Sequence, residues 1–161
     1  MLEGFQPILS STPKVLILGS MPSVTSLEKH EYYGFKHNRF WKIMHAYFQK
    51  PISTYEEKQA IIKEHQLMVW DVIAMCEREG SLDSKIKNVT PNPIKEQLEN
   101  YPSIEAIICN GKKSYDLFLR YFKDVDLPII YLPSTSNANR TIKEEVLFVL
   151  WFTTLDRFNL R

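Results

Sequence analysis

Four short apolar segments alternate with helical patterns along the chain, and this alternation constrains the fold more than any other feature. The apolar segments are Val15–Leu18, Leu67–Val72, Ile104–Cys109 and Pro128–Leu132. Continuous apolar runs of this length are typical of parallel strands that are buried on both faces. The helical patterns cover Asn38–Gln49, Thr54–His65, Pro93–Tyr101, Lys112–Phe122 and Thr141–Phe158. The alternation predicts a three-layer α/β/α fold with a four-stranded, mostly parallel central sheet.

The length and the even composition favour one domain over residues 1–161. No repeat, low-complexity stretch or linker interrupts the chain. Thr54 begins one helical pattern and Glu57 follows three residues later, which predicts a capping box.

Charge and cysteine content exclude several classes of site. The formal net charge is +1, so DNA binding would need a local basic patch. Two cysteines, Cys76 and Cys109, cannot hold a four-cysteine zinc site or an iron–sulfur cluster, and the four histidines show no ligand spacing. We therefore expect no metal and no cofactor. We also expect reduced thiols and a cytoplasmic monomer with no signal peptide and no membrane span.

Polar loops follow all four predicted strands. They are Gly19-Ser-Met-Pro22, then Asp71 with the later Gly80–Ser84, then Asn110-Gly-Lys112, and finally Pro133–Arg140. The carboxyl ends of parallel strands share one sheet edge, where ligands bind in open α/β folds. The sequence therefore predicts a functional site at this edge.

Each candidate residue there has two interpretations. Asn38 is a helix cap or an amide that orients a polar group. Either Tyr32 or Tyr33 is a stacking platform, or both are ordinary aromatic residues. Asn110 is a turn residue or an amide that reads a base edge. Asp71 is a base or a buried, hydrogen-bonded residue.

The remaining polar and charged residues near this edge are also ambiguous. The loop after the fourth strand either caps a helix or grips phosphates. The nearby cationic residues are solvated or form a DNA-facing patch: Lys36, His37, Arg39, Lys112, Lys113, Arg140 and Lys143. No phosphate-binding glycine loop and no nucleophile–base pair is present.

Taken together, the motifs resemble the uracil-DNA glycosylase superfamily. Gly19-Ser-Met-Pro-Ser23, Tyr32-Tyr-Gly34 and Asn38-Arg-Phe-Trp-Lys42 look like the first motif of its mismatch-specific branch, and Leu132–Arg140 looks like the second. That branch carries a catalytic asparagine where Met21 stands here. With Trp70-Asp71, Gly80–Ser84 and Asn110-Gly111, the chain is more similar to the hypoxanthine-DNA glycosylase family.

The resemblance implies a monofunctional DNA repair glycosylase acting on a deaminated base, with hypoxanthine first and uracil as the alternative. It makes Asn38 and Asn110 catalytic, with the Asn38 amide oxygen orienting water and Asn110 bonding the base edge. It places the flipped base beside Gly19, Ser20, Met21 and Pro22, stacked on Tyr33. It assigns DNA contacts to Ser134, Thr135, Ser136, Asn137, Ala138, Asn139 and Arg140. A lesion-binding module without catalysis is the rival from another class.

Overall fold

The computed structural model describes residues 1–161. Its eight strands are β1 (Leu2–Glu3), β2 (Ile8–Leu9), β3 (Val15–Gly19), β4 (Leu67–Asp71), β5 (Ile73–Glu77), β6 (Lys87–Pro91), β7 (Ala106–Asn110) and β8 (Ile129–Leu132). Its helices are α1 (Val24–Lys29), α2 (Phe40–Phe48), α3 (Tyr55–Glu64), α4 (Ile94–Asn100), α5 (Lys112–Tyr121) and α6 (Glu144–Leu155), with short 3₁₀ turns η1 (Asp83–Lys85) and η2 (Asp156–Phe158).

The main sheet has the order β2-β4-β3-β7-β8. The four predicted strands are its parallel members, so the predicted α/β class is confirmed. The sheet also contains β2, which pairs antiparallel with β4 and which the prediction of four strands left out. Two residues are too few to give a periodic pattern, and this explains the omission.

A second, antiparallel sheet with the order β1-β5-β6 was not predicted. The chain enters β5 two residues after β4 ends, and β5 then pairs with β6 across a register irregularity. The strands β1 and β6 contain exposed or partly exposed residues throughout, so they carry no apolar run. Their pairing depends on contacts between distant segments, which local sequence does not encode.

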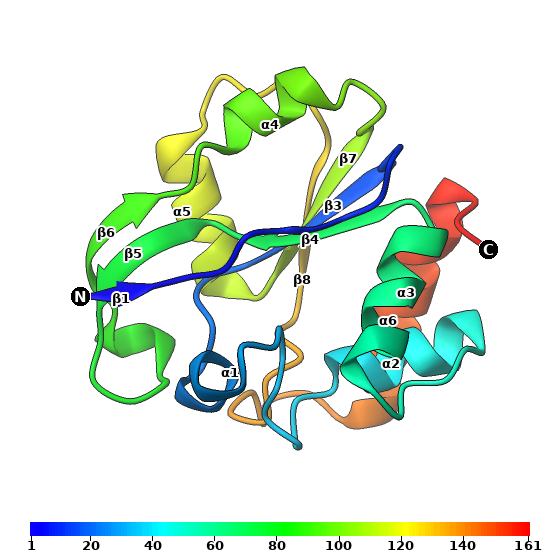
Figure 1. The fold of residues 1–161 in the computed structure, drawn as a ribbon, viewed down its shortest axis with the longest axis horizontal. Coiled ribbons are helices and arrows are strands. Elements are labelled where there is room, and N and C mark those ends of the chain that lie inside the picture. The colour runs from blue at the N-terminus through cyan, green and yellow to red at the C-terminus, as the bar shows by residue number, and fades with distance from the viewer.

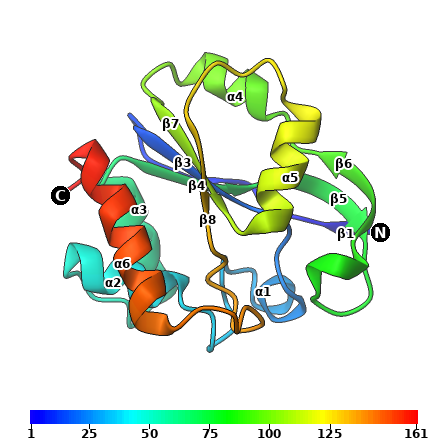
Figure 2. The ribbon, with the colours of Figure 1, turned by 180° about the vertical axis from the view of Figure 1, so that it is seen from behind.

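The helices cover both faces of the main sheet. Helices α2, α3 and α6 gather on one side and α4 and α5 on the other, which gives the predicted three layers (Figures 1 and 2). The predicted capping box begins α3: the Thr54 side chain accepts the Glu57 N–H, and the Glu57 side chain accepts the Thr54 N–H. The buried side chains form one continuous cluster between the layers. No helix is both long and apolar enough to cross a bilayer.

The strand register brings the four carboxyl ends together. Gly19 lies opposite Asp71, and Asn110 lies opposite Leu132. Helix α1 and the loop after β8 lie beyond this edge, at the bottom of the view in Figure 1. The polar loops predicted to converge therefore meet in one place.

Candidate active site

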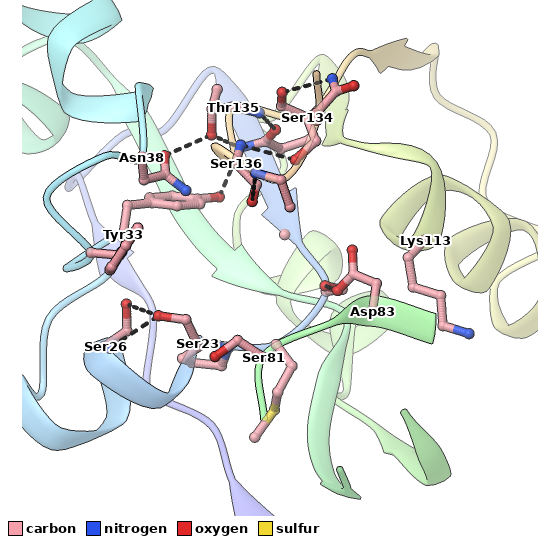
Figure 3. Close-up of a pocket in the computed structure, with 18 of the residues that line it drawn as sticks. Ser23, Ser26, Tyr33, Asn38, Ser81, Asp83, Lys113, Ser134, Thr135 and Ser136 are labelled. Carbon is pink, nitrogen blue, oxygen red and sulfur yellow. Dashed lines mark hydrogen bonds between the residues drawn. The ribbon is translucent and has the colours of Figure 1, made fainter. Parts of the chain in front are cut away.

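A cavity of about 770 Å³ opens at the carboxyl edge of the main sheet. This volume lies within the range of small-molecule sites. Four segments contribute most of its walls: the turn after β3, the loop before α2, the segment around η1, and the loop after β8. Figure 3 shows their side chains pointing toward a common space.

The turn after β3 forms one wall, and all the residues predicted for the base pocket line the cavity: Gly19, Ser20, Met21, Pro22 and Tyr33. Gly19 permits a close approach, because a Cβ there would lie 2.5 Å from Asp71 Oδ1 and 3.1 Å from the Tyr33 hydroxyl. The Ser20 hydroxyl donates to Asp83 Oδ1 at 2.7 Å, which ties this turn to η1.

The structure separates the roles of the two neighbouring tyrosines. The Tyr32 ring is buried against Phe5, and its hydroxyl donates to the Gln6 carbonyl at 2.8 Å. The Tyr33 ring stacks on Phe40, with centroids 4.2 Å apart, and its hydroxyl lies beside Gly19 on the cavity wall. Burial raises the pKa of both phenols, so both hydroxyls remain neutral. Tyr33 is therefore the aromatic residue placed to contact a bound ring.

Two serines fix the loop that carries Tyr33. Ser23 caps α1 by accepting the Ser26 N–H, and the buried Ser26 hydroxyl oxygen accepts the Gly34 N–H at 2.8 Å. This anchor holds Tyr33 in the left-handed region, with φ 53°. This conformation is uncommon for a non-glycine residue, and its surroundings must stabilise it.

Asn38 lies at the mouth of the cavity, just before α2. Its amide oxygen accepts the Phe40 N–H and the Thr135 hydroxyl, both at 2.9 Å. Because these donors use both lone pairs, the oxygen is not free to orient water as expected from the sequence. The amide nitrogen instead has no partner in the protein and faces the cavity (Figure 3). The free group of Asn38 in this structure is thus its amide nitrogen, whereas the sequence analysis expected its oxygen to act, and its catalytic role stays a prediction.

Asn110 ends β7 and is nearly fully buried. Its amide oxygen accepts the Thr135 N–H at 3.0 Å, and its amide nitrogen donates to the Thr135 hydroxyl at 3.0 Å and to the Tyr33 hydroxyl at 3.3 Å. Both N–H groups of its amide are used internally, whereas its oxygen accepts one hydrogen bond and keeps a second lone pair. The predicted contact with a base edge stays a prediction. Asn110 acts on the cavity by positioning Thr135 and Tyr33.

The predicted DNA-binding loop after β8 divides into two parts. Ser134, Thr135, Ser136, Asn137, Ala138 and Asn139 line the cavity, whereas Arg140 is exposed outside it. Thr135 is fully buried, and its hydroxyl links Asn38 to Asn110. The Thr135 hydroxyl is therefore used inside the protein, and the DNA contact predicted for this residue stays a prediction.

Arg39 also differs from expectation. Its guanidinium donates to the carbonyls of Thr135, Ser136 and Asn139 at 2.7–3.3 Å. The sequence left Arg39 either solvated or in a DNA-facing patch, and the structure shows a third use, in which its donors hold the loop after β8.

The segment around η1, which the sequence predicted at this edge as Gly80–Ser84, forms a wall of the cavity. Ser81, Leu82, Asp83 and Ser84 line it opposite the loop after β8, and the Ser81 hydroxyl oxygen accepts the Val24 N–H at 2.9 Å. Its contact with α1 was not predicted, because nothing local in the sequence indicates it. Phe35 is a lining residue that the sequence did not predict, because it carries no distinguishing signal.

Burial raises the pKa values of Asp71, in the cavity wall, and of Cys109, the residue before Asn110 in β7. Burial, then the charge of Asp83, raises the pKa of Asp71 to about 7, while Arg78 opposes the shift. Burial raises the pKa of Cys109 to about 12, so this thiol is not a nucleophile. No group of three or more potential metal ligands occurs in the molecule.

Comparisons with known proteins match this architecture. Residues 7–155 fit the family model of the uracil DNA glycosylase superfamily. The chain belongs to the uracil-DNA glycosylase superfamily. This confirms the family resemblance predicted from the motifs.

Two curated relatives are named hypoxanthine DNA glycosylase. The relative from Methanosarcina acetivorans is 37% identical and the one from Methanosarcina barkeri 32%, each over 86% of this chain and 88% of its own length. The solution NMR structure of a candidate uracil DNA glycosylase from Methanosarcina acetivorans superposes with a TM-score of 0.81, at 32% identity and 96% coverage of both chains.

Proposed function

We propose that this protein is a monofunctional DNA glycosylase that releases hypoxanthine from deoxyinosine in DNA. The observation that carries the proposal is the hydrogen-bonded Asn38–Thr135–Asn110 cluster, which aims an uncharged amide donor into a cavity large enough to admit a base. The names of the two Methanosarcina relatives support hypoxanthine as the base. We also propose that the enzyme acts as a cytoplasmic monomer.

The cavity suits a base extruded from the DNA stack. An enzyme that acts on a base must first remove it from the duplex, at a cost of a few kcal/mol. Tyr33 offers a ring whose far face is fixed by Phe40, so it provides a rigid platform for the flipped base. The exposed part of the loop after β8, with Ala138 and Arg140, is where we expect the DNA backbone to lie.

The chemistry is hydrolysis of the bond between C1′ and N9. As this bond breaks, its electron pair moves to the base and leaves an oxocarbenium-like sugar. Water then adds to C1′, and the proton it loses balances the charge of the departing base. The cavity-facing N–H₂ group of Asn38 donates to the negative charge that develops on the base.

The lysines of the cavity do not fit a lyase mechanism. Lys112 lies at the start of α5 and pairs with Asp116 at 2.8 Å. The Lys113 amine points away from Asn38 (Figure 3). Neither lysine is placed to attack C1′, so we propose that the product is an abasic site without strand cleavage.

The test is single-turnover cleavage of duplexes carrying one deoxyinosine or one deoxyuridine, followed by alkaline strand scission. We expect release of hypoxanthine and no nick without alkali. Asn38→Ala should abolish most of the hypoxanthine release. The matched control is Asn100→Ala, which removes an exposed amide on α4 at the opposite end of the sheet and should leave the release unchanged. Cleavage of deoxyuridine alone would contradict the proposed base. Cleavage of neither, with tight binding to lesion DNA, would indicate a binding module.

A further inference from the structure

Asp71 is a carboxyl group in the cavity wall that the hydrolysis described above does not use. It is the last residue of β4, and only 4% of it is exposed. Its backbone carbonyl accepts the Asn92 side-chain N–H₂ at 2.8 Å, but its side-chain Oδ2 is buried without any hydrogen-bond partner. A buried polar atom without a partner destabilises a fold. A carboxyl group that is buried in this way and lines a cavity is a candidate for contact with a ligand.

The local structure keeps space open for this carboxyl. Asp71 lies opposite Gly19 in the sheet register, and a Cβ at position 19 would lie 2.5 Å from Asp71 Oδ1. The absence of a side chain at position 19 therefore lets the carboxyl occupy the floor beside the Tyr33 hydroxyl. Both groups line the cavity, so a bound ring would meet them together.

Few charged groups face Asp71. Asp83 of η1 is held by Ser20 and disfavours ionisation, whereas Arg78, which donates to the Pro22 and Gly80 carbonyls, favours it. The other titratable neighbours are the neutral phenols of Tyr32 and Tyr33. With burial added, the pKa of Asp71 is raised to about 7, so at slightly acid pH the carboxyl is mostly protonated. A protonated carboxyl presents one O–H donor and one acceptor.

We propose that Asp71 reads the flipped base as a neutral carboxylic acid, donating its O–H to O6 of hypoxanthine and accepting from N1–H. Hypoxanthine carries this carbonyl and N–H side by side, so the two hydrogen bonds form a closed pair. Uracil presents the same two groups, which makes the contact a determinant shared by these deaminated bases. This inference rests on the proposed glycosylase function and adds a specificity-determining residue to it.

The experiment compares deoxyinosine with 1-methyldeoxyinosine, which lacks the N1–H, in otherwise identical duplexes. Single-turnover rates are measured from pH 5.5 to 9 for the wild type, Asp71→Ala and Asp71→Asn. Asp126→Asn, an exposed carboxylate before β8, is the matched control for loss of one negative charge. Melting curves at pH 6 establish that each variant is folded.

We expect Asp71→Ala to slow deoxyinosine cleavage roughly 10- to 100-fold, as loss of two hydrogen bonds implies. Asp71→Asn should retain most of the rate, because its amide also offers one donor beside one acceptor. The wild-type rate should fall above pH 7 as Asp71 ionises, and the Asn variant should lack that fall. A fall in rate at alkaline pH that both proteins share reflects ionisation of the hypoxanthine base, not of Asp71. The methyl group should slow the wild type strongly and the Ala variant hardly at all.

The outcomes distinguish this inference from the proposed function. If the wild type does not release hypoxanthine, the proposed function fails and the inference fails with it. If the wild type cleaves and a folded Asp71→Ala variant cleaves equally well, only the role of Asp71 is overturned. The same holds if the methyl group slows the Ala variant as much as the wild type. A further substrate, 7-deazadeoxyinosine, lacks N7. If Asp71→Ala cleaves it as fast as the wild type does, Asp71 acts as an acid at N7, and the proposed contact with O6 and N1–H is overturned.

Discussion

Two sets of polar groups in the cavity wall differ in how their hydrogen bonds are used. In the mouth network, Asn38 bonds the buried Thr135, Thr135 bonds Asn110, and the Asn38 N–H₂ group remains directed into the cavity. On the floor, Asp71 has a buried oxygen with no partner, beside a glycine that leaves it room. The hydrogen bonds of the mouth network are formed without a ligand, so its geometry is fixed in advance. Asp71 has an oxygen without a partner, so a ligand can supply a hydrogen bond there.

The largest expected effect tests whether the buried Asp71 carboxyl lowers the free energy of unfolding. Replacing Asp71 with Asn should raise the free energy of unfolding at pH 8, because a buried carboxyl without a partner no longer has to ionise. The pKa of Asp71 is about 7 in the folded protein and 3.8 in the unfolded chain. The free energy of unfolding of the wild type therefore falls as the pH rises from 3.8 to 7, and it stays at the lower value above pH 7. The difference amounts to roughly 4 kcal/mol.

Urea denaturation of both proteins at pH 4 and pH 8 measures this effect. The gain of the Asn variant should shrink toward zero at pH 4, where Asp71 is protonated in both states. An equal gain at both pH values would show that the carboxyl does not titrate as the floor of the cavity predicts.

The next effect tests which end of the Asn38 amide acts. Asp at position 38 keeps the oxygen that accepts from Phe40 and Thr135 but has no N–H₂ group. If the donor acts on the departing base, Asn38→Asp should lose roughly 100-fold or more in single-turnover rate, as Asn38→Ala does. Retained activity in the Asp variant would restore the role of the oxygen as the group that orients water.

A smaller effect tests the centre of the mouth network. Thr135→Val keeps the shape but removes the hydroxyl that joins Asn38 to Asn110, which leaves two buried amide atoms each without one partner. We expect a loss of about 1–3 kcal/mol in unfolding free energy and roughly 10-fold in cleavage rate. Thr135→Ser, which keeps the hydroxyl, is the control; equal behaviour of Val and Ser would contradict a network role.

The smallest effect concerns the charge beside the floor. Asp83→Asn keeps an acceptor for Ser20 but removes a negative charge that raises the pKa of Asp71. The alkaline fall of the cleavage rate should therefore move to lower pH by a fraction of a pH unit. A shift to higher pH would mean that the fall belongs to another group.

The position of the site was predictable from sequence, whereas the direction of its hydrogen bonds was not. Gly19, Asp71 and Asn110 each end a strand of a parallel sheet, and the geometry of such a sheet brings them to one edge. How the amides of Asn38 and Asn110 are bonded depends on Thr135, which is 97 residues from Asn38 and 25 residues from Asn110 in sequence. No local pattern encodes that three-way contact.

The same limit explains the other differences. Arg39 lies in a cationic stretch that suggests DNA, yet its donors reach carbonyls of a loop about 100 residues later. Tyr32 and Tyr33 are adjacent and chemically identical, but the Tyr32 ring is buried against Phe5, whereas Tyr33, with its left-handed backbone, stacks on Phe40 with its hydroxyl beside Gly19. Long-range pairing and backbone conformation decided these outcomes.

The guanidinium of Arg39 has a consequence for how the protein meets DNA. Since it already holds three carbonyls of the loop after β8, the loop has its shape in the free protein. Ordering a flexible loop on binding would weaken association, and a loop ordered in advance avoids that loss. The free energy gained from contact with the duplex can then be used to open it. Because Arg39 keeps the loop rigid, we expect the DNA to deform on binding and the loop to keep its shape. Base pairs that open easily would then be favoured.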